Sequence, residues 1–191
     1  MLFVSTPALS ESLQPMEAVQ QGVEAGLRIL NAPGYKEPGR DEEKQKKLRI
    51  ILEQLFDFEE FSRRVLASRW KQFTPSQQVA FVNVFTDFLT KYYIGKILER
   101  YRDERVLYLK QSIESPTLAL VNVEVIWKGQ QVPVDLPMIK RKGVWKIYEI
   151  QVLGISAVSF YRAQFKYLLS KETPAQVIDR IKNRIQKIDS N

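Results

Sequence analysis

The sequence predicts an α+β fold in which an antiparallel sheet of about four strands is wrapped by helices. Apolar residues recur at helical spacing as far as Tyr101, alternate from Arg105 to Val152, and return to helical spacing after Gly154. Helices therefore come first, strands second and helices last, a segregation that is typical of α+β domains. A chain of 191 residues is long enough for one domain with a sizeable core.

Helix boundaries are marked by caps and loops. Two helical segments at the start of the chain are separated by a loop at residues 31–41, which contains two prolines and two glycines. Asp57 can cap the next helix, which should continue through Trp70. The sequences TPSQ at 74–77 and TPAQ at 173–176 are capping boxes with proline at the first helical position. The first of them should begin a helix of roughly seven turns.

The strands are predicted from alternation between apolar and polar residues. One face of the best-marked strand should carry Ala119, Val121, Val123, Val125 and Trp127. Residues 128–130 and 140–143 read as hairpin turns, and residues 144–152 as the last strand. Gly154 should then turn the chain off the sheet into a helix capped by Ser156 or Ser159.

Missing residue types exclude several kinds of site. The chain has no cysteine and therefore no disulfide, thiolate nucleophile or Cys-ligated metal. It has no histidine, which excludes Ser-His triads and His-ligated metals. It has no glycine-rich phosphate loop and no run of about 18 apolar residues. We therefore expect a soluble protein without a cofactor.

The net charge of +7 favours negatively charged partners. Nucleic acid is not expected among them, because the predicted strand faces are apolar and basic residues fall at turns and helix surfaces. Adjacent acids at 42–43 and 59–60 should point apart on helices and be solvated. The acids expected near the core, as caps or strand partners, are Asp57, Glu124, Asp135 and Glu149.

The first residues resemble the end of a secretory signal, because Ala8 and Ser10 fit a small-x-small cleavage pattern. Residues 1–12 are therefore expected to be a signal-peptide remnant, and the alternative is a disordered native N-terminus. Residues 13–188 should form a single domain.

Three groups of residues, in this order and spacing, resemble the MlaC, or toluene-tolerance, family. They are FDFEEFS at 56–62 before RWKQFTPSQ at 69–77; the stripe Phe81, Phe85, Leu89 and Tyr92; and GVWKIYEI at 143–150 before GIS at 154–156 and YRAQF at 161–165. The resemblance covers about residues 15 to 188. Glu149 departs from the family pattern, in which an aspartate is expected.

The resemblance implies a fold similar to nuclear-transport-factor-like domains, with an apolar cavity between the sheet and the helices. It implies a periplasmic phospholipid-binding protein that carries lipid as cargo. Its partners would be an inner-membrane ABC transporter with an MCE-domain subunit and an outer-membrane lipoprotein complex, in a system that maintains outer-membrane lipid asymmetry. We expect a monomer.

The cavity lining is predicted from the aromatic helix, the inward strand faces and the segment after Gly154. The predicted lipid-binding residues are Phe81, Phe85, Leu89, Tyr92, Val123, Val125, Val134, Leu136, Ile155, Val158 and Tyr161. Two other functions stay open. One is a small cavity enzyme of isomerase or dehydratase type, which would have to use Asp or Glu with Tyr. The other is an adaptor without a ligand, in which the apolar residues are simply core.

Overall fold

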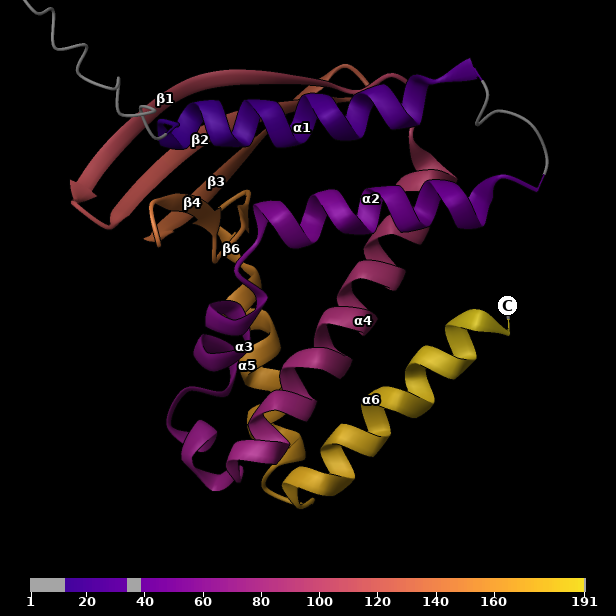
Figure 1. The fold of residues 1–191 in the computed structure, drawn as a ribbon, viewed down its shortest axis with the longest axis vertical. Helices are drawn as coiled ribbons and strands as arrows, with labels where there is room; N and C mark the ends of the chain where they lie inside the picture. The colour runs from indigo at the N-terminus through magenta and orange to yellow at the C-terminus, as the bar shows by residue number, and fades with distance from the viewer. Residues whose placement is uncertain (1–12, 34–38, 191) are drawn as a thin grey trace, which may run out of the picture.

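The computed structural model describes residues 13–33 and 39–190, and these have the predicted α+β architecture (Figure 1). The signal remnant expected at residues 1–12 and part of the loop expected at 31–41 lie outside the described residues. The elements are α1 (Pro15–Asn31), α2 (Asp41–Leu55), α3 (Phe58–Leu66), the 3₁₀ helix η2 (Ala67–Gln72), α4 (Pro75–Arg100), β1 (Arg105–Ser115), β2 (Leu118–Trp127), β3 (Gln130–Arg141), β4 (Val144–Ile147), β5 (Gln151–Val152), β6 (Ile155–Ser156), α5 (Ala157–Leu168) and α6 (Pro174–Asp189).

The sheet is open and antiparallel, with strand order β1-β2-β3-β5-β6 and β4 also paired with β3. Its central ladder joins β2 to β3 from Leu118 opposite Ile139 to Trp127 opposite Gln130. Residues 119, 121 and 123 are buried on one face, as the alternation predicts.

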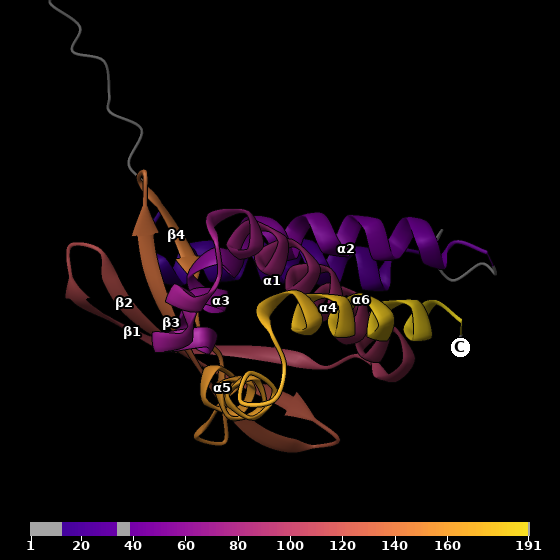
Figure 2. The ribbon, with the colours of Figure 1, turned by 90° about the horizontal axis from the view of Figure 1, so that it is seen from below.

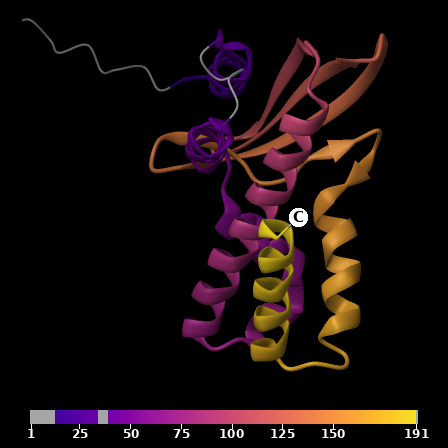
Figure 3. The ribbon, with the colours of Figure 1, turned by 90° about the vertical axis from the view of Figure 1, so that its right-hand side faces the viewer.

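Most buried apolar residues of the described chain form two separate clusters. The upper cluster in Figure 1 packs Val19 of α1 against the inner face of the sheet, including Val121 and Met138. The lower cluster is formed by α3, α4, α5 and α6 around Phe81 and Phe85. Helix α6 lies along α4 (Figures 2 and 3), and the side view shows it well below α1 (Figure 3).

Both capping boxes are present. The hydroxyl of Thr74 accepts a hydrogen bond from the backbone N–H of Gln77, whose side chain accepts one from the Thr74 N–H. Thr173 and Gln176 make the same pair at the start of α6. These bonds satisfy N–H groups that the helix itself leaves free, so α4 and α6 begin where the sequence predicts.

The helix expected to continue through Trp70 ends earlier. Ala67 has a φ of 50°, which breaks the α-helix after Leu66, and residues 67–72 continue as the 3₁₀ helix η2. The positive φ at an alanine gives no signal in the sequence, because alanine is a strong helix former.

The last predicted strand, residues 144–152, is divided into β4 and β5, and the chain after Gly154 adds the short strand β6, so the sheet has six strands rather than about four. The buried carboxylate of Glu149 accepts hydrogen bonds from the N–H groups of Ile150 and Val158 and from the hydroxyl of Ser156. Turning this side chain inward interrupts the strand between β4 and β5, and the same carboxylate ties the sheet to the start of α5. Glu149 is thus a cap, as expected.

Glu60 corrects the prediction that its acidic pair is solvated. Its side chain is 1% exposed, and its carboxylate contacts Arg63 at 2.7 Å, Arg64 at 2.8 Å and Arg141 at 2.7 Å. Arg141 also reaches Asp57 at 2.6 Å, so β3 is joined to the start of α3. Burial alone would raise the pKa of Glu60, but the hydrogen bonds from Arg63 and Arg64 lower that pKa below its ordinary value.

We expect Glu60→Gln to lower the free energy of unfolding by about 3 kcal/mol at neutral pH, because it removes the charge that three arginines contact. Urea unfolding measures the change, and the exposed neighbour substitution Glu59→Gln is the control, with a change within about 0.5 kcal/mol.

A lowered folded-state pKa stabilises the protein above the ordinary pKa of glutamate, and this contribution is lost as pH falls through the folded-state value. The difference between wild type and Glu60→Gln should therefore shrink in acid. A pH-independent difference would mean that the charge is not what stabilises this contact.

Candidate ligand cavity

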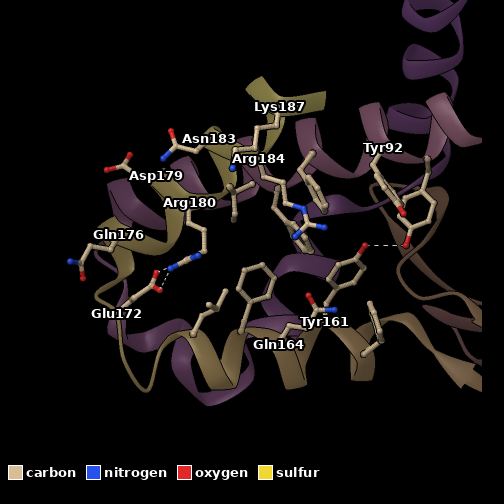
Figure 4. A pocket seen from close by; sticks show the side chains of 17 residues that line it. Tyr92, Tyr161, Gln164, Glu172, Gln176, Asp179, Arg180, Asn183, Arg184 and Lys187 are labelled. Carbon is tan, nitrogen blue, oxygen red and sulfur yellow. Dashed lines mark hydrogen bonds and ion pairs between the residues drawn. The ribbon is translucent and has the colours of Figure 1, made fainter. Parts of the chain in front are cut away.

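A cavity of about 930 Å³ lies between α4, α5 and α6 (Figure 4). Its volume is near the top of the range of roughly 300–1,000 Å³ that is usual for ligand sites. The lining residues are Phe85, Phe88, Tyr92, Tyr93, Phe160, Tyr161, Gln164, Phe165, Leu168, Glu172, Gln176, Asp179, Arg180, Ile181, Asn183, Arg184 and Lys187.

One wall is aromatic and is supplied by α4 and α5. The ring of Phe85 lies 5.1 Å from that of Phe165 and 5.2 Å from that of Tyr161, both edge to face. Phe88 stacks on Tyr92 at 5.9 Å. Edge-to-face packing fixes the ring positions, so this wall is a stable apolar surface.

The facing wall is polar and comes from α6 (Figure 4). Arg180 is bound to Glu172, with its Nε 3.0 Å from a carboxylate oxygen. Arg184 lies over the ring of Phe88, 5.6 Å from its centroid. Among residues 13–33 and 39–190, Arg184 and Lys187 pair with no carboxylate. The cavity therefore sets two cations without an anionic partner against an apolar wall.

The acids on the cavity wall are occupied. The hydrogen bond from Arg180 lowers the pKa of Glu172, which keeps that carboxylate ionised. Asp179 pairs with Lys182 at 3.0 Å. Neither acid is placed as a free general base.

Two tyrosine hydroxyls meet at the end of the cavity nearest the sheet. The hydroxyl of Tyr93 on α4 lies 3.0 Å from that of Tyr161 on α5 (Figure 4). Burial of Tyr161, together with this hydrogen bond, raises the pKa of its hydroxyl. Tyr161 therefore stays neutral and links α4 to α5.

Three predicted lipid-binding residues, Phe85, Tyr92 and Tyr161, line this cavity. Phe81, Leu89 and Val158 are buried in the helical cluster behind it. Val123, Val125, Val134 and Leu136 belong to the upper cluster with α1. Ile155 is 68% exposed on the β5–β6 hairpin. The expected place for a cavity, under the inward strand faces, is filled by α1, whose apolar stripe packs there.

The polar wall of α6 was missed. Its signal is in the sequence, because Arg180, Arg184 and Lys187 are spaced four and three residues apart and so share a helix face. Val177 and Ile181 of the same helix are buried, and a cavity lining predicted from apolar faces alone does not include the charged residues beside them.

In the part of the chain that the structure describes, no cluster of acidic side chains is arranged to hold a metal ion, and no helix is long and apolar enough to cross a bilayer.

A family model described as MlaC protein matches residues 20–183. The chain belongs to the MlaC family. The resemblance inferred from the three residue groups is confirmed. A solved structure of a phospholipid-binding protein from Ralstonia solanacearum, in complex with a phospholipid, has the same fold as this MlaC chain. The TM-score is 0.77 at 22% identity, over 93% of this chain and 99% of that one. No curated protein matches the sequence.

Removing either hydroxyl of the tyrosine pair should destabilise the fold, and the two substitutions should differ in cost. Tyr93→Phe leaves the buried hydroxyl of Tyr161 without its partner and should cost about 1–3 kcal/mol in the free energy of unfolding. Tyr161→Phe leaves a hydroxyl on Tyr93, which is 44% exposed, and should cost about 0.5–1.5 kcal/mol. Urea unfolding measures both, with Tyr92→Phe as the neutral control. Equal costs would mean that water in the cavity replaces the lost bond.

Proposed function

We propose that this chain binds a phospholipid in the cavity between α4, α5 and α6 and carries it between two membranes. The observation that carries the proposal is the pairing of an aromatic wall with Arg184 and Lys187, which have no anionic partner in the described residues. Membership of the MlaC family supports it, as does the likeness to a protein solved with a phospholipid.

The two walls match the two parts of a phospholipid. An acyl chain gains about 0.8 kcal/mol for each methylene that it buries, and the rings of α4 and α5 offer it an apolar surface. A phosphate accepts charge-assisted hydrogen bonds, and Arg184 and Lys187 can donate them. An apolar ligand without an anionic group would leave these two cations unused.

In this proposal the protein works in the periplasm. It exchanges phospholipid with an inner-membrane ABC transporter that carries an MCE-domain subunit and with an outer-membrane lipoprotein complex, and so helps to maintain outer-membrane asymmetry. The chain has no nucleotide-binding motif, so the energy for directed transfer would come from the transporter.

Lipid extraction of the purified protein, combined with native mass spectrometry, tests the proposal. We expect phospholipid to copurify and delipidated protein to take up phospholipid from vesicles. If neither occurs, the cavity does not serve a lipid and the carrier function is disproved.

A residue of the cavity wall can be enlarged without disturbing the core. Gln164 lines the cavity and is exposed, so Gln164→Trp should occupy part of the space and lower the bound phospholipid per protein molecule by at least about twofold. The control is Ala163→Trp, at the exposed neighbouring position that does not line the cavity. Equal loss in both variants would place the lipid elsewhere.

Charge reversal tests the phosphate contact. The double variant Arg184→Glu, Lys187→Glu should weaken phospholipid binding by about tenfold, because carboxylates would then face the phosphate. The control is the double variant Lys46→Glu, Lys166→Glu, at exposed positions outside the cavity lining, and it should change binding little. Competition against a fluorescent phospholipid measures both affinities. Unchanged affinity in the double variant would show that the headgroup points away from α6.

A further inference from the structure

Two hairpin turns point toward the same end of the sheet. The β2–β3 turn contains Lys128 and Gly129, and the β5–β6 turn contains Leu153 and Gly154. The backbone N–H of Leu153 donates to the carbonyl of Pro133, three residues after the start of β3, at 3.1 Å. The β5–β6 turn therefore lies beside the first half of β3 and faces the same end of the sheet as the β2–β3 turn, and in Figure 3 the β5–β6 hairpin projects sideways above α5.

These turns expose large apolar side chains. Leu153 is 64% exposed and Ile155 68%, and Trp127 at the other turn is 41% exposed. Phe160, one turn into α5, is 55% exposed and also lines the cavity. Trp127, Leu153, Ile155 and Phe160 are called the tip residues below. Solvent-facing turns are usually polar, so such a group marks a contact surface.

The backbone conformation at position 153 does not favour a leucine. Its φ is 52°, a region that favours Gly, Asn and Asp, and a leucine there is strained. Its side chain is not buried either, so the fold gains no apolar contact in return. Neither the conformation of the turn nor burial in the core therefore favours a leucine at this position.

We propose that the tip residues dock on the surface of a phospholipid bilayer. The apolar side chains stand on convex turns, which a fluid bilayer can accommodate without a shaped groove. Trp127 lies beside Lys128, whose Nζ is 4.8 Å from the centre of its ring. An aromatic ring at the interface with a lysine reaching to the headgroups is the arrangement that bilayer surfaces favour.

The charge of the chain and the position of the cavity agree with this partner. The net charge of +7 attracts anionic lipid at long range. Phe160 belongs both to the tip residues and to the cavity lining, so a docked molecule would hold its cavity next to the bilayer. Membrane docking goes beyond the proposed lipid binding, and the two can be tested separately.

Flotation with vesicles of phosphatidylethanolamine and phosphatidylglycerol tests the proposal. We expect wild type to float with the vesicles and the double variant Leu153→Asp, Ile155→Asp to bind at least about tenfold more weakly. The control is the double variant Val79→Asp, Val144→Asp, which adds the same two negative charges on valines that are 62% and 55% exposed, in the first turns of α4 and beside the β3–β4 turn at the other end of β3. Circular dichroism checks that all variants are folded.

Trp127 supplies a second readout. Its emission should shift to the blue when vesicles are added. Trp127→Phe should remove the shift, because, of the other two tryptophans, Trp145 is 6% exposed and Trp70 is partly buried against the helical cluster. Absence of wild-type flotation, or equal flotation of the tip double variant and the Val79→Asp, Val144→Asp control, would overturn the proposal. Without wild-type flotation, the partner of these turns would be a protein rather than a bilayer. Equal flotation of the two variants would mean that the net charge of the protein, and not the tip residues, attracts it to the vesicles.

A monomeric short-chain phosphatidylcholine separates docking from cargo binding, because it can enter the cavity without a bilayer. Uptake of this lipid by wild type without vesicle binding would disprove docking and leave the carrier function intact. Vesicle binding without uptake of the short-chain lipid would disprove the carrier function and leave docking intact. If both proposals hold, the tip double variant still takes up the short-chain lipid.

Discussion

The contact of Arg141 with Asp57 and Glu60 holds the two halves of the molecule in a fixed relation. Arg141 stands on β3, and the two carboxylates stand at the start of α3. Both acids are buried, so their charges are stabilised by arginines rather than by water. Moving β3 away from α3 would remove one of the three arginines that contact Glu60 and would leave the Asp57 carboxylate without its arginine, at a cost of several kcal/mol. The sheet with α1 and the bundle of α3 to α6 can therefore keep separate apolar clusters without separating.

This division explains how a cavity persists in a folded chain. Protein interiors normally close up on empty space, so the walls must be anchored elsewhere. The start of α5 is bound by Glu149 through the Val158 N–H, and its middle by Arg162, which donates to the Arg64 carbonyl at 2.8 Å and 3.1 Å. On α6, Val177 and Ile178 are buried against the bundle and do not line the cavity. Each wall is held by contacts outside the cavity, so collapse would have to break them.

The sequence predicts local structure well and the cavity only partly. Capping boxes and periods of two and 3.6 place α4, α6 and the β2–β3 ladder, because these signals act over a few residues. The spacing of apolar residues also identifies the apolar face of each helix and strand, but it does not show which of these faces pack against each other. Val123 and Phe85 give the same signal, although one packs under α1 and the other lines the cavity. Glu60 looks like a solvated helix acid until Arg141, 81 residues away, comes next to it.

If the cavity holds a phospholipid, the same physics that retains the lipid also limits its release. Burying ten methylenes contributes on the order of 8 kcal/mol before the costs of binding, and escape into water would have to give most of this back. Transfer then requires an apolar surface close to the opening, so that the chain does not cross water. Phe160 lies both on the cavity wall and among the exposed tip residues, and so it marks the side of the molecule from which a lipid has the shortest path to such a surface.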